Sequence, residues 1–289
     1  MGLTYLYRNV RVSNMKVALI GLGRWGTILK GELSKTTEIK YTCDSKTDLN
    51  QIFSDLDVQA VFIATPTETH FEIARKALEA GKHVFLEKPG TTNSTDLEKL
   101  VNLAKERNLK FAVDYEFTYH PGIKKVKELI EGKNIKSIHL EWQKWGTFKD
   151  DAVMHLLCHD VSVLKYLGFN SLSPFNTMKK RVISDSDLVW TEFKSEKETY
   201  IESLINRASP IKQKTLTVLL DKGGYIMSNN DLFSINTETQ ALDKIELPDI
   251  TPVSASIEDF LSAITDNREP QSNSDFALEV FKVIEKVKY

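Results

Sequence analysis

The chain has 289 residues, of which 41% are hydrophobic and 27% charged, as in ordinary globular proteins of one large or two medium domains. The 38 Lys and Arg residues are balanced by 40 Asp and Glu residues, so the basic excess typical of a nucleic-acid binder is absent and no such partner is expected. Cys43 and Cys158 cannot build a disulfide framework, and no apolar run has the length of a secretory signal or membrane span, so we expect a cytoplasmic protein without a membrane partner.

Up to about residue 115, short apolar runs alternate with amphipathic helical patterns, and residues 1–14 are interpreted either as a short arm or as the result of start-codon choice. The expected strands are Lys16–Gly21, Ile39–Asp44, Ala60–Thr65, His83–Pro89 and Lys110–Tyr115. The expected helices are residues 22–33, Leu49–Leu56, Pro66–Ala80 and Asp96–Arg107. Continuously apolar strands that alternate with helices predict a parallel sheet covered on both faces.

The pattern changes after a helix expected within Thr118–Gly132. Strand patterns then follow one another with few helices between them: Ser137–Gly146, Val182–Ser195, Thr199–Ala208, Lys214–Ser228 and Leu232–Leu242. This indicates an α+β region with an antiparallel or mixed sheet, a helix at Asp151–Gly168 on one face, and two final helices. We predict two domains, residues 1–117 and residues 118–289.

The segment GLGRWG follows the first strand and opens a helix, and its glycines fit the G-x-G-x-x-G pattern of dinucleotide-binding turns. Gly21 would make the tight turn, Gly23 would let the backbone approach a diphosphate, and Gly26 would allow close packing of helix and strand. The intervening Arg24 and Trp25 open the helix, whose N-terminus suits phosphate groups.

Asp44 ends the second strand at the spacing expected of an acid that binds a ribose. It should accept hydrogen bonds from the adenosine 2′-hydroxyl and repel a 2′-phosphate, which favours NAD over NADP. Lys46 could pair with a 2′-phosphate and weaken that preference.

The segment Thr65–Glu68 reads as a capping box with Pro66 at the first helical position, and His70 is interpreted as structural. This turn nevertheless lies where ligands of open α/β sheets bind, at the carboxyl ends of the strands.

Glu87 and Lys88 end the fourth strand and are followed by Pro89. A solvated charge pair is the simpler interpretation. The alternative is that the apolar strand delivers a desolvated lysine ammonium into the cofactor cleft, with Pro89 fixing the backbone that aims it.

A regular helix at Asp151–Gly168 would place His155 and His159 one turn apart on the same stripe. Two imidazoles at this spacing could bind one metal ion, could be satisfied core groups, or could act as acid and base. Cys158 fits a metal site awkwardly and no third ligand is apparent, so no metal is predicted.

Taken in order, these motifs resemble the Gfo/Idh/MocA family of NAD(P)-dependent sugar and cyclitol oxidoreductases. The resemblance covers nearly the whole chain from Met15. It rests on the glycine turn, A-T-P-x-x-x-H, E-K-P, FTYHPGIKKVKELIEG, the helix with His159, and SIEDFLSAI. It implies a Rossmann domain, then a domain with an open-faced sheet that pairs subunits into a homodimer or homotetramer.

The resemblance implies NAD or NADP as the cofactor. The residues implied to bind it are Gly21, Gly23, Arg24, Trp25, Gly26, Asp44, Thr65, Pro66, His70, Glu87 and Lys88.

Members of the family commonly use the lysine of E-K-P with an aspartate and a histidine spaced D-x-x-x-H. Lys88 and His159 match this pattern, while His155 stands in the aspartate's place unless Asp151 substitutes for it. By this resemblance His159 would be the base for a hydroxyl proton, and Lys88 would steady the developing alkoxide. His155 and Asp160 would orient His159 or bind a neighbouring substrate hydroxyl.

A second departure from the family lies between Asp44 and Val61, where there is room for one helix only. We therefore predict a shortened Rossmann sheet that lacks one edge strand. This loss should expose the adenine side of the pocket and weaken cofactor binding.

Tyr115, His120 and Trp145 lie in segments expected to border the substrate, and all three could instead be ordinary packing residues. The expected activity is hydride transfer between a nicotinamide and a carbinol or ketone carbon of a sugar, nucleotide sugar or cyclitol. The alternatives are a non-catalytic NAD(P)-binding regulator on the same scaffold and a glycosidase that uses bound NAD for transient oxidation.

Overall fold

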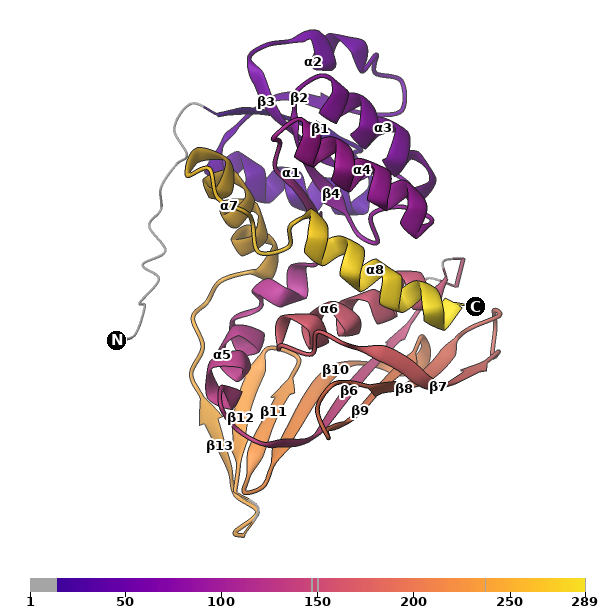
Figure 1. Cartoon of the computed structure of the whole chain (residues 1–289), viewed down its shortest axis with the longest axis vertical. Coiled ribbons are helices and arrows are strands. Elements are labelled where there is room, and N and C mark those ends of the chain that lie inside the picture. The colour runs from indigo at the N-terminus through magenta and orange to yellow at the C-terminus, as the bar shows by residue number, and fades with distance from the viewer. Residues whose placement is uncertain (1–14, 147, 150, 237, 289) are drawn as a thin grey trace. The chain divides into compact units, whose positions relative to one another are not determined.

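A computed structural model of the chain (Figure 1) describes residues 15–146, 148–149, 151–236 and 238–288. Residues 1–14, interpreted above as a short arm, lie outside the described residues. The described chain divides into two compact units. The first comprises residues 15–114 and Val253–Asp275, and the second comprises Tyr115–Pro252 and residues 276–288.

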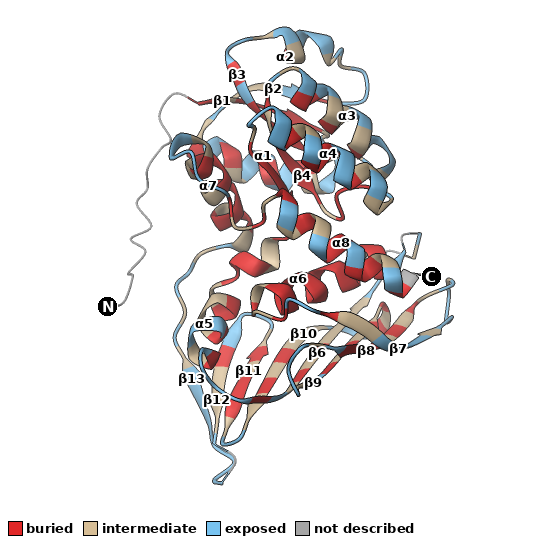
Figure 2. Ribbon diagram, viewed as in Figure 1, coloured by how far each residue is buried: buried red, intermediate tan, exposed pale blue. Residues whose placement is uncertain are grey.

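The first unit contains a five-stranded sheet in the order β2-β1-β3-β4-β5, and all its strand pairs are parallel. The strands are β1 (Lys16–Ile20), β2 (Glu38–Cys43), β3 (Val58–Ile63), β4 (His83–Glu87) and β5 (Phe111–Asp114). The helices are α1 (Arg24–Thr36), α2 (Asn50–Ser54), α3 (Thr67–Glu79) and α4 (Ser94–Glu106). The predicted Rossmann arrangement is therefore confirmed, and most residues of the central strands β1, β3 and β4 are buried (Figure 2).

The predicted loss of an edge strand is also confirmed. Between β2 and β3 the chain forms only the short helix α2, so β2 is the last strand on its side of the sheet. Lys40 on β2 pairs with Asp55 at 2.6 Å and with Asp57 at 3.0 Å. Charged side chains on an edge strand disfavour pairing with another chain.

The division of the chain differs from the two continuous domains that we predicted. Helix α7 (Pro252–Thr265) packs into the core of the first unit, where the Phe260 ring lies 5.6 Å from Phe62 and 5.4 Å from Phe85. The Val113 N–H also donates to the Ser272 carbonyl. The reason is that the apolar side of α7 is buried by strands that precede it by more than 130 residues, and chain order does not reveal such pairing.

The second unit contains an eight-stranded sheet in the order β13-β12-β11-β10-β6-β9-β8-β7. Its strands are β6 (Ile135–Trp145), β7 (Ser173–Lys180), β8 (Leu188–Lys194), β9 (Tyr200–Asn206), β10 (Ala208–Leu220), β11 (Gly224–Ser228), β12 (Asp231–Ile235) and β13 (Leu242–Ile245). Strands β6 and β9 pair in parallel and the other pairs are antiparallel, which confirms the mostly antiparallel sheet. The edge strand β7 was not predicted, because its largely exposed residues carry no apolar alternation.

One face of this sheet is covered by helices, and the other carries polar groups that pair among themselves. The helical segments are η1 (Glu116–Tyr119), α5 (Pro121–Ile130), the π-turn η2 (Val153–Leu157), α6 (Cys158–Tyr166) and α8 (Ser274–Lys288). On the opposite face Glu202 accepts hydrogen bonds from His139 at 2.8 Å, Trp190 at 3.0 Å and Tyr200 at 2.9 Å.

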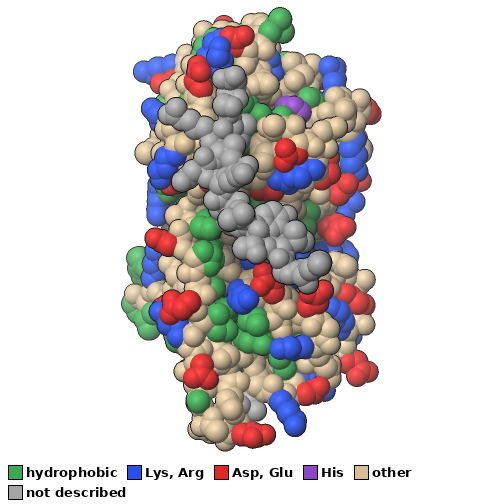
Figure 3. All heavy atoms as spheres, turned by 90° about the vertical axis from the view of Figure 1, so that its left-hand side faces the viewer, with side chains coloured by type: hydrophobic (Ala, Val, Ile, Leu, Met, Phe, Trp, Pro, Cys, Tyr) green, Lys and Arg blue, Asp and Glu red, His purple; other side chains and the backbone are tan. Residues whose placement is uncertain are grey.

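None of the helices within the described residues combines the length and hydropathy that a membrane crossing requires. On the face drawn in Figure 3, basic and acidic side chains of the described residues are interspersed.

Candidate functional site

Two of the three glycines in the turn after β1 have no room for a side chain. Gly21 has φ +100°, and a Cβ there would overlap the Ala64 carbonyl and lie 2.9 Å from the Thr65 nitrogen. A Cβ on Gly26 would overlap the Gly21 carbonyl oxygen, whereas a Cβ on Gly23 would meet nothing within 4 Å. Gly21 and Gly26 are thus needed for close packing, and Gly23 faces open space as a ligand-binding turn requires.

Helix α1 begins at Arg24 without a side-chain cap, and its first turn holds no acidic residue. Backbone N–H groups in a first turn have no partner within the helix and carry partial positive charge, so this terminus suits an anion. Arg24 is exposed, whereas Trp25 is half-buried and packs against the core cluster of the first unit. The Trp25 side chain therefore packs against the core, while its backbone N–H belongs to the first turn of α1.

Asp44 lies in an exposed turn directly after β2. Its Oδ1 accepts hydrogen bonds from the Lys46 N–H at 2.9 Å and from the Thr47 hydroxyl at 3.0 Å. The Lys46 N–H and then the Thr47 hydroxyl lower the pKa of Asp44, so the group stays ionised at neutral pH.

The turn after β3 differs from the predicted capping box. Helix α3 begins at Thr67, with Pro66 at its N-cap, and no side-chain cap bond is made. The Thr65 hydroxyl accepts from the Thr69 hydroxyl at 2.7 Å. Because Pro66 has an extended ψ of 141°, the helix starts one residue later than the motif suggested.

His70 is 1% exposed, and its ring nitrogens lie 3.0 Å from the Gly90 carbonyl oxygen and 2.8 Å from the Thr65 carbonyl oxygen. Both nitrogens are thus engaged by backbone groups. This favours the structural interpretation of His70 over direct contact with a cofactor.

Glu87 and Lys88 stand where predicted, at the carboxyl end of β4. Glu87 is 7% exposed and Lys88 is half-buried. The Lys88–Pro89 peptide bond is cis, and the turn continues to Gly90, whose φ is +100°. The first unit therefore gathers its glycine turn, Asp44 and Lys88 at the carboxyl edge of one parallel sheet.

In the second unit, the segment predicted as one regular helix contains a π-turn, η2, before α6 begins at Cys158. The regular helix predicted over both histidines is therefore replaced by a π-turn that holds His155 and an α-helix that holds His159. His155 is half-buried and His159 is 3% exposed. Asp151 caps the segment through its Oδ1, which accepts from Val153 N–H at 2.8 Å.

The His159 ring packs against two aromatic side chains, which also contact each other. Its centroid lies 4.8 Å from the Phe117 ring and 4.9 Å from the Trp142 ring. Such contacts fix the plane of the imidazole, as a positioned acid or base requires.

Asp160 does not take the role that we predicted. It is fully buried, accepts from the Ser203 hydroxyl at 2.7 Å and lies 4.0 Å from the Lys214 ammonium. Burial raises the pKa of Asp160, while Lys214 and Ser203 act in the opposite direction. Adjacent helical residues point in different directions, so Asp160 faces strands β9 and β10 of the sheet instead of orienting His159.

The predicted substrate residues are dispersed. Tyr115 is buried with its ring 6.1 Å from Phe276. His120 caps α5 by accepting from the Gly122 N–H at 3.0 Å, and its other nitrogen lies 3.3 Å from the Asn230 side-chain oxygen. Trp145 is 63% exposed at the end of β6. Packing and capping account for Tyr115 and His120, whereas Trp145 stays available for a ligand.

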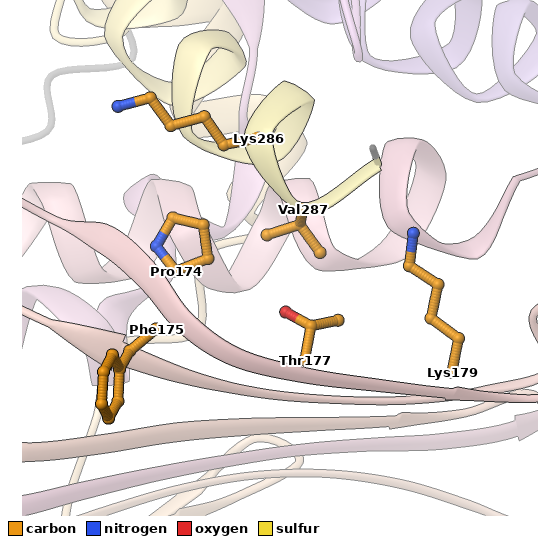
Figure 4. Close-up of a pocket in the computed structure, with 6 residues that line it drawn as sticks. All are labelled: Pro174, Phe175, Thr177, Lys179, Lys286 and Val287. Atoms are coloured by element: carbon orange, nitrogen blue, oxygen red, sulfur yellow. The ribbon is translucent and has the colours of Figure 1, made fainter.

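No set of three or more metal-ligating His, Cys, Asp or Glu side chains occurs in the part of the chain that the structure describes. The second unit also has a cavity of about 500 Å³ between β7 and the end of α8 (Figure 4). It is lined by Pro174, Phe175, Thr177, Lys179, Lys286 and Val287. It holds none of the predicted site residues.

Part of the first unit is similar to a known protein family. Residues 27–115 match the model of the oxidoreductase family with an NAD-binding Rossmann fold, Gfo/Idh/MocA. Over these residues the chain is similar to members of this family.

Among the relatives is UDP-N-acetylglucosamine 3-dehydrogenase from Acidithiobacillus ferrooxidans, which is 34% identical over 112 residues. This match covers 37% of the chain and 35% of the relative, so the aligned sequence spans about a third of that protein.

Solved structures extend the likeness in fold to both units. The same dehydrogenase superposes with a TM-score of 0.86 at 21% identity, covering 95% of this chain and 96% of that one. KijD10, a 3-ketoreductase from Actinomadura kijaniata crystallised with TDP-benzene and NADP, gives a TM-score of 0.84 at 17% identity, with 95% and 96% coverage.

Sequence reasoning did not single out Phe117, Ser203 and Lys214. The Lys214 ammonium lies 3.2 Å from the Phe117 ring centroid and 4.2 Å from that of Trp142, so it shares both rings with His159. The three residues come from separate elements and have no motif spacing. The one sequence signal that could have drawn attention to Lys214 is a lysine on the face of a predicted strand that is expected to be buried.

Proposed function

We propose that the chain is an NAD(P)-dependent oxidoreductase that moves a hydride between a nicotinamide and a carbinol or ketone carbon of a sugar or nucleotide sugar. The observation that carries the proposal is the uncapped N-terminus of α1 beneath the open turn at Gly23. A diphosphate there would receive the first-turn N–H groups.

The residues of the first unit fit a dinucleotide. Gly23 leaves room for a diphosphate, and the ionised Asp44 can accept from a ribose hydroxyl. A 2′-phosphate beside Asp44 would be repelled, so we propose a preference for NAD. When bound, the nicotinamide would supply the centre that takes or gives the hydride.

Lys88 and His159 are the proposed catalytic residues. His159, which packs against Phe117 and Trp142, would take the hydroxyl proton on an imidazole nitrogen during oxidation and return it during reduction. The Lys88 ammonium would stabilise negative charge that develops on a substrate oxygen. His155 would assist as a hydrogen-bonding residue.

The substrate class is proposed from the relatives. The dehydrogenase from Acidithiobacillus ferrooxidans is named for UDP-N-acetylglucosamine, and KijD10 was crystallised with a TDP ligand. Nucleotide sugars are therefore the first substrates to test, followed by aldoses and inositols.

A panel of these compounds with NAD and NADP, followed at the nicotinamide absorbance, tests the proposal. Lys88→Met and His159→Asn should each lower kcat by about a hundredfold or more. Lys99→Met and His83→Gln are matched controls, because Lys99 lies exposed on α4 and His83 lies at the opposite end of β4. Wild-type rates in both site variants would refute the assignment.

We further propose that the polar sheet face around Glu202 pairs subunits into a homodimer or homotetramer. Light scattering after size-exclusion chromatography should give a multiple of the chain mass. Tyr200→Asp, which places a charge on that face, should shift the protein toward the monomer; a monomeric wild type would contradict the proposal.

A further inference from the structure

His70 connects two turns of the first unit through both nitrogens of its ring. Nε2 lies 2.8 Å from the Thr65 carbonyl oxygen, and Nδ1 lies 3.0 Å from the Gly90 carbonyl oxygen. Both partners are acceptors. The side chain is 1% exposed, so water cannot replace either carbonyl as a hydrogen-bond partner of the ring.

The two turns are the ones that carry the proposed function. Thr65 follows Ala64, whose carbonyl fits against Gly21 so closely that no Cβ could stand there. Gly90 closes the turn that holds Lys88, and its N–H donates to the Glu87 carbonyl at 3.2 Å. The imidazole thus links the turn at Ala64 and Thr65, which packs against Gly21, to the turn that holds Lys88.

The chemistry of the ring makes this link depend on protons. A neutral imidazole has one N–H and one lone pair, so it can donate to only one of the two carbonyls. At the other carbonyl two lone pairs face each other across hydrogen-bond distance. An imidazolium donates to both carbonyls.

The surroundings of His70 shift its pKa in opposite directions. Burial lowers the pKa of His70, and Lys88 on the neighbouring turn lowers it further. The Thr65 carbonyl, the Gly90 carbonyl and Glu68 on the same helix act to raise it. The neutral ring therefore predominates at neutral pH, and its second proton binds below the ordinary midpoint of about 6.5.

We propose that His70 is a proton-dependent positioning residue, which completes the link between the cofactor-side turns only when its imidazole carries two protons. The inference rests on the proposed function, because it takes the carboxyl edge of this sheet to be the dinucleotide site. Proton binding at His70 and dinucleotide binding then strengthen each other, since linkage between two sites is reciprocal.

The binding test uses ADP-ribose, which has the ribose and diphosphate groups of the cofactor and no redox chemistry. Its dissociation constant is measured by calorimetry at about pH 8 and about pH 5.5, on either side of the histidine range. Of the six histidines, His70 and His83 lie in the first unit. His83→Gln is therefore the matched control for His70→Gln.

In the wild type and in His83→Gln, ADP-ribose should bind about three- to tenfold more tightly at the lower pH, the effect of one added hydrogen bond. In His70→Gln this pH dependence should vanish, because an amide gains no proton. Full pH dependence in His70→Gln, or none in the wild type, would overturn the proposal.

A second measurement separates this inference from the proposed function. In ¹³C-labelled protein the His70 ring signal should titrate below about pH 6.5, and the amide signals of Thr65 and Gly90 should follow the same midpoint. ADP-ribose should raise that midpoint. If ADP-ribose binds to no variant, the proposed function fails and the free-protein titration alone decides; a His70 ring or turn amides that do not titrate would overturn the link.

Discussion

The backbone of Gly26 lies against the carbonyl oxygen of Gly21, so that a Cβ on Gly26 would overlap that oxygen. The first turn of α1 is thereby pressed onto the end of β1. Helix and turn can hold this position only with glycine at residue 26.

Gly26→Ala should therefore displace the start of α1 and weaken binding of NAD or ADP-ribose by more than about tenfold, as misplaced N–H groups lose their phosphate. Gly31→Ala is the control on the same helix, since a Cβ there meets nothing within 4 Å. That variant should gain about 0.5–1 kcal/mol of unfolding free energy from the better helix former. Equal binding by both variants would contradict the packing argument.

Asp44 should set the choice between NAD and NADP. Asp44→Ser removes an ionised group that accepts from the Lys46 N–H, so repulsion of a 2′-phosphate is lost. The ratio of the NADP and NAD dissociation constants should shift toward NADP by about tenfold. Asp48→Asn, four residues further along the same loop, should leave the ratio unchanged; a shift there as well would point to general charge effects.

The edge position of β2 should limit cofactor affinity. No strand flanks β2 on its outer side in the described sheet, so a bound adenine would have less protein around it on that side. Titration of NADH fluorescence should give a dissociation constant in the micromolar range. A nanomolar value would contradict the prediction.

The buried pair of Asp160 and Lys214 should be costly to break from one side. Lys214→Met leaves the fully buried Asp160 without its cation, and chemical denaturation at neutral pH should show a loss of about 3 kcal/mol. Removing Lys214 raises the pKa of Asp160 further, so the deficit is full above that pKa and shrinks as pH falls through it and the carboxyl gains its proton.

The double variant Asp160→Asn with Lys214→Met should recover most of the lost stability, because it leaves no buried charge. Additive losses in the double-mutant cycle would show that the two groups do not interact.

His83 should make the first unit sensitive to acid. Burial, and then the positive charge of Lys110, lower the pKa of His83 from 6.5 to about 4. The unfolded chain therefore takes up this proton at a higher pH than the folded chain, so stability is full above about pH 6.5 and is lost as pH falls toward about 4, by about 3 kcal/mol. His83→Gln should lose less stability over this interval in denaturant titrations; an equal loss would assign the acid sensitivity elsewhere.

Some features could be found only in the tertiary structure, although they lie in segments for which a strand or helix was predicted. The strand predicted over Val182–Ser195 is formed only at Leu188–Lys194. Before it, the buried Asp187 accepts from the Val182 N–H at 2.9 Å and pairs with Arg207 at 3.0 Å. A polar network of this kind holds a loop where propensity alone favours a strand.

The sequence by itself determined the Rossmann unit, its missing edge strand, and the positions of Gly21, Gly26, Asp44 and Lys88 at strand ends. These follow from local patterns, because continuous apolar strands, glycine spacing and chain length between strands each act over a few residues. Successive strand patterns after residue 132 likewise predicted the second sheet, and the family resemblance added the expectation of an open face.

Only the tertiary structure decided that α7 completes the first core, that a π-turn holding His155 precedes α6, and that Asp160 faces Ser203 and Lys214. Each depends on contacts between elements distant in the chain, or on a local change of helical period that side-chain spacing cannot reveal. The two carbonyls at His70 belong to the same class, since the motif shows a histidine but not the groups that its ring nitrogens meet.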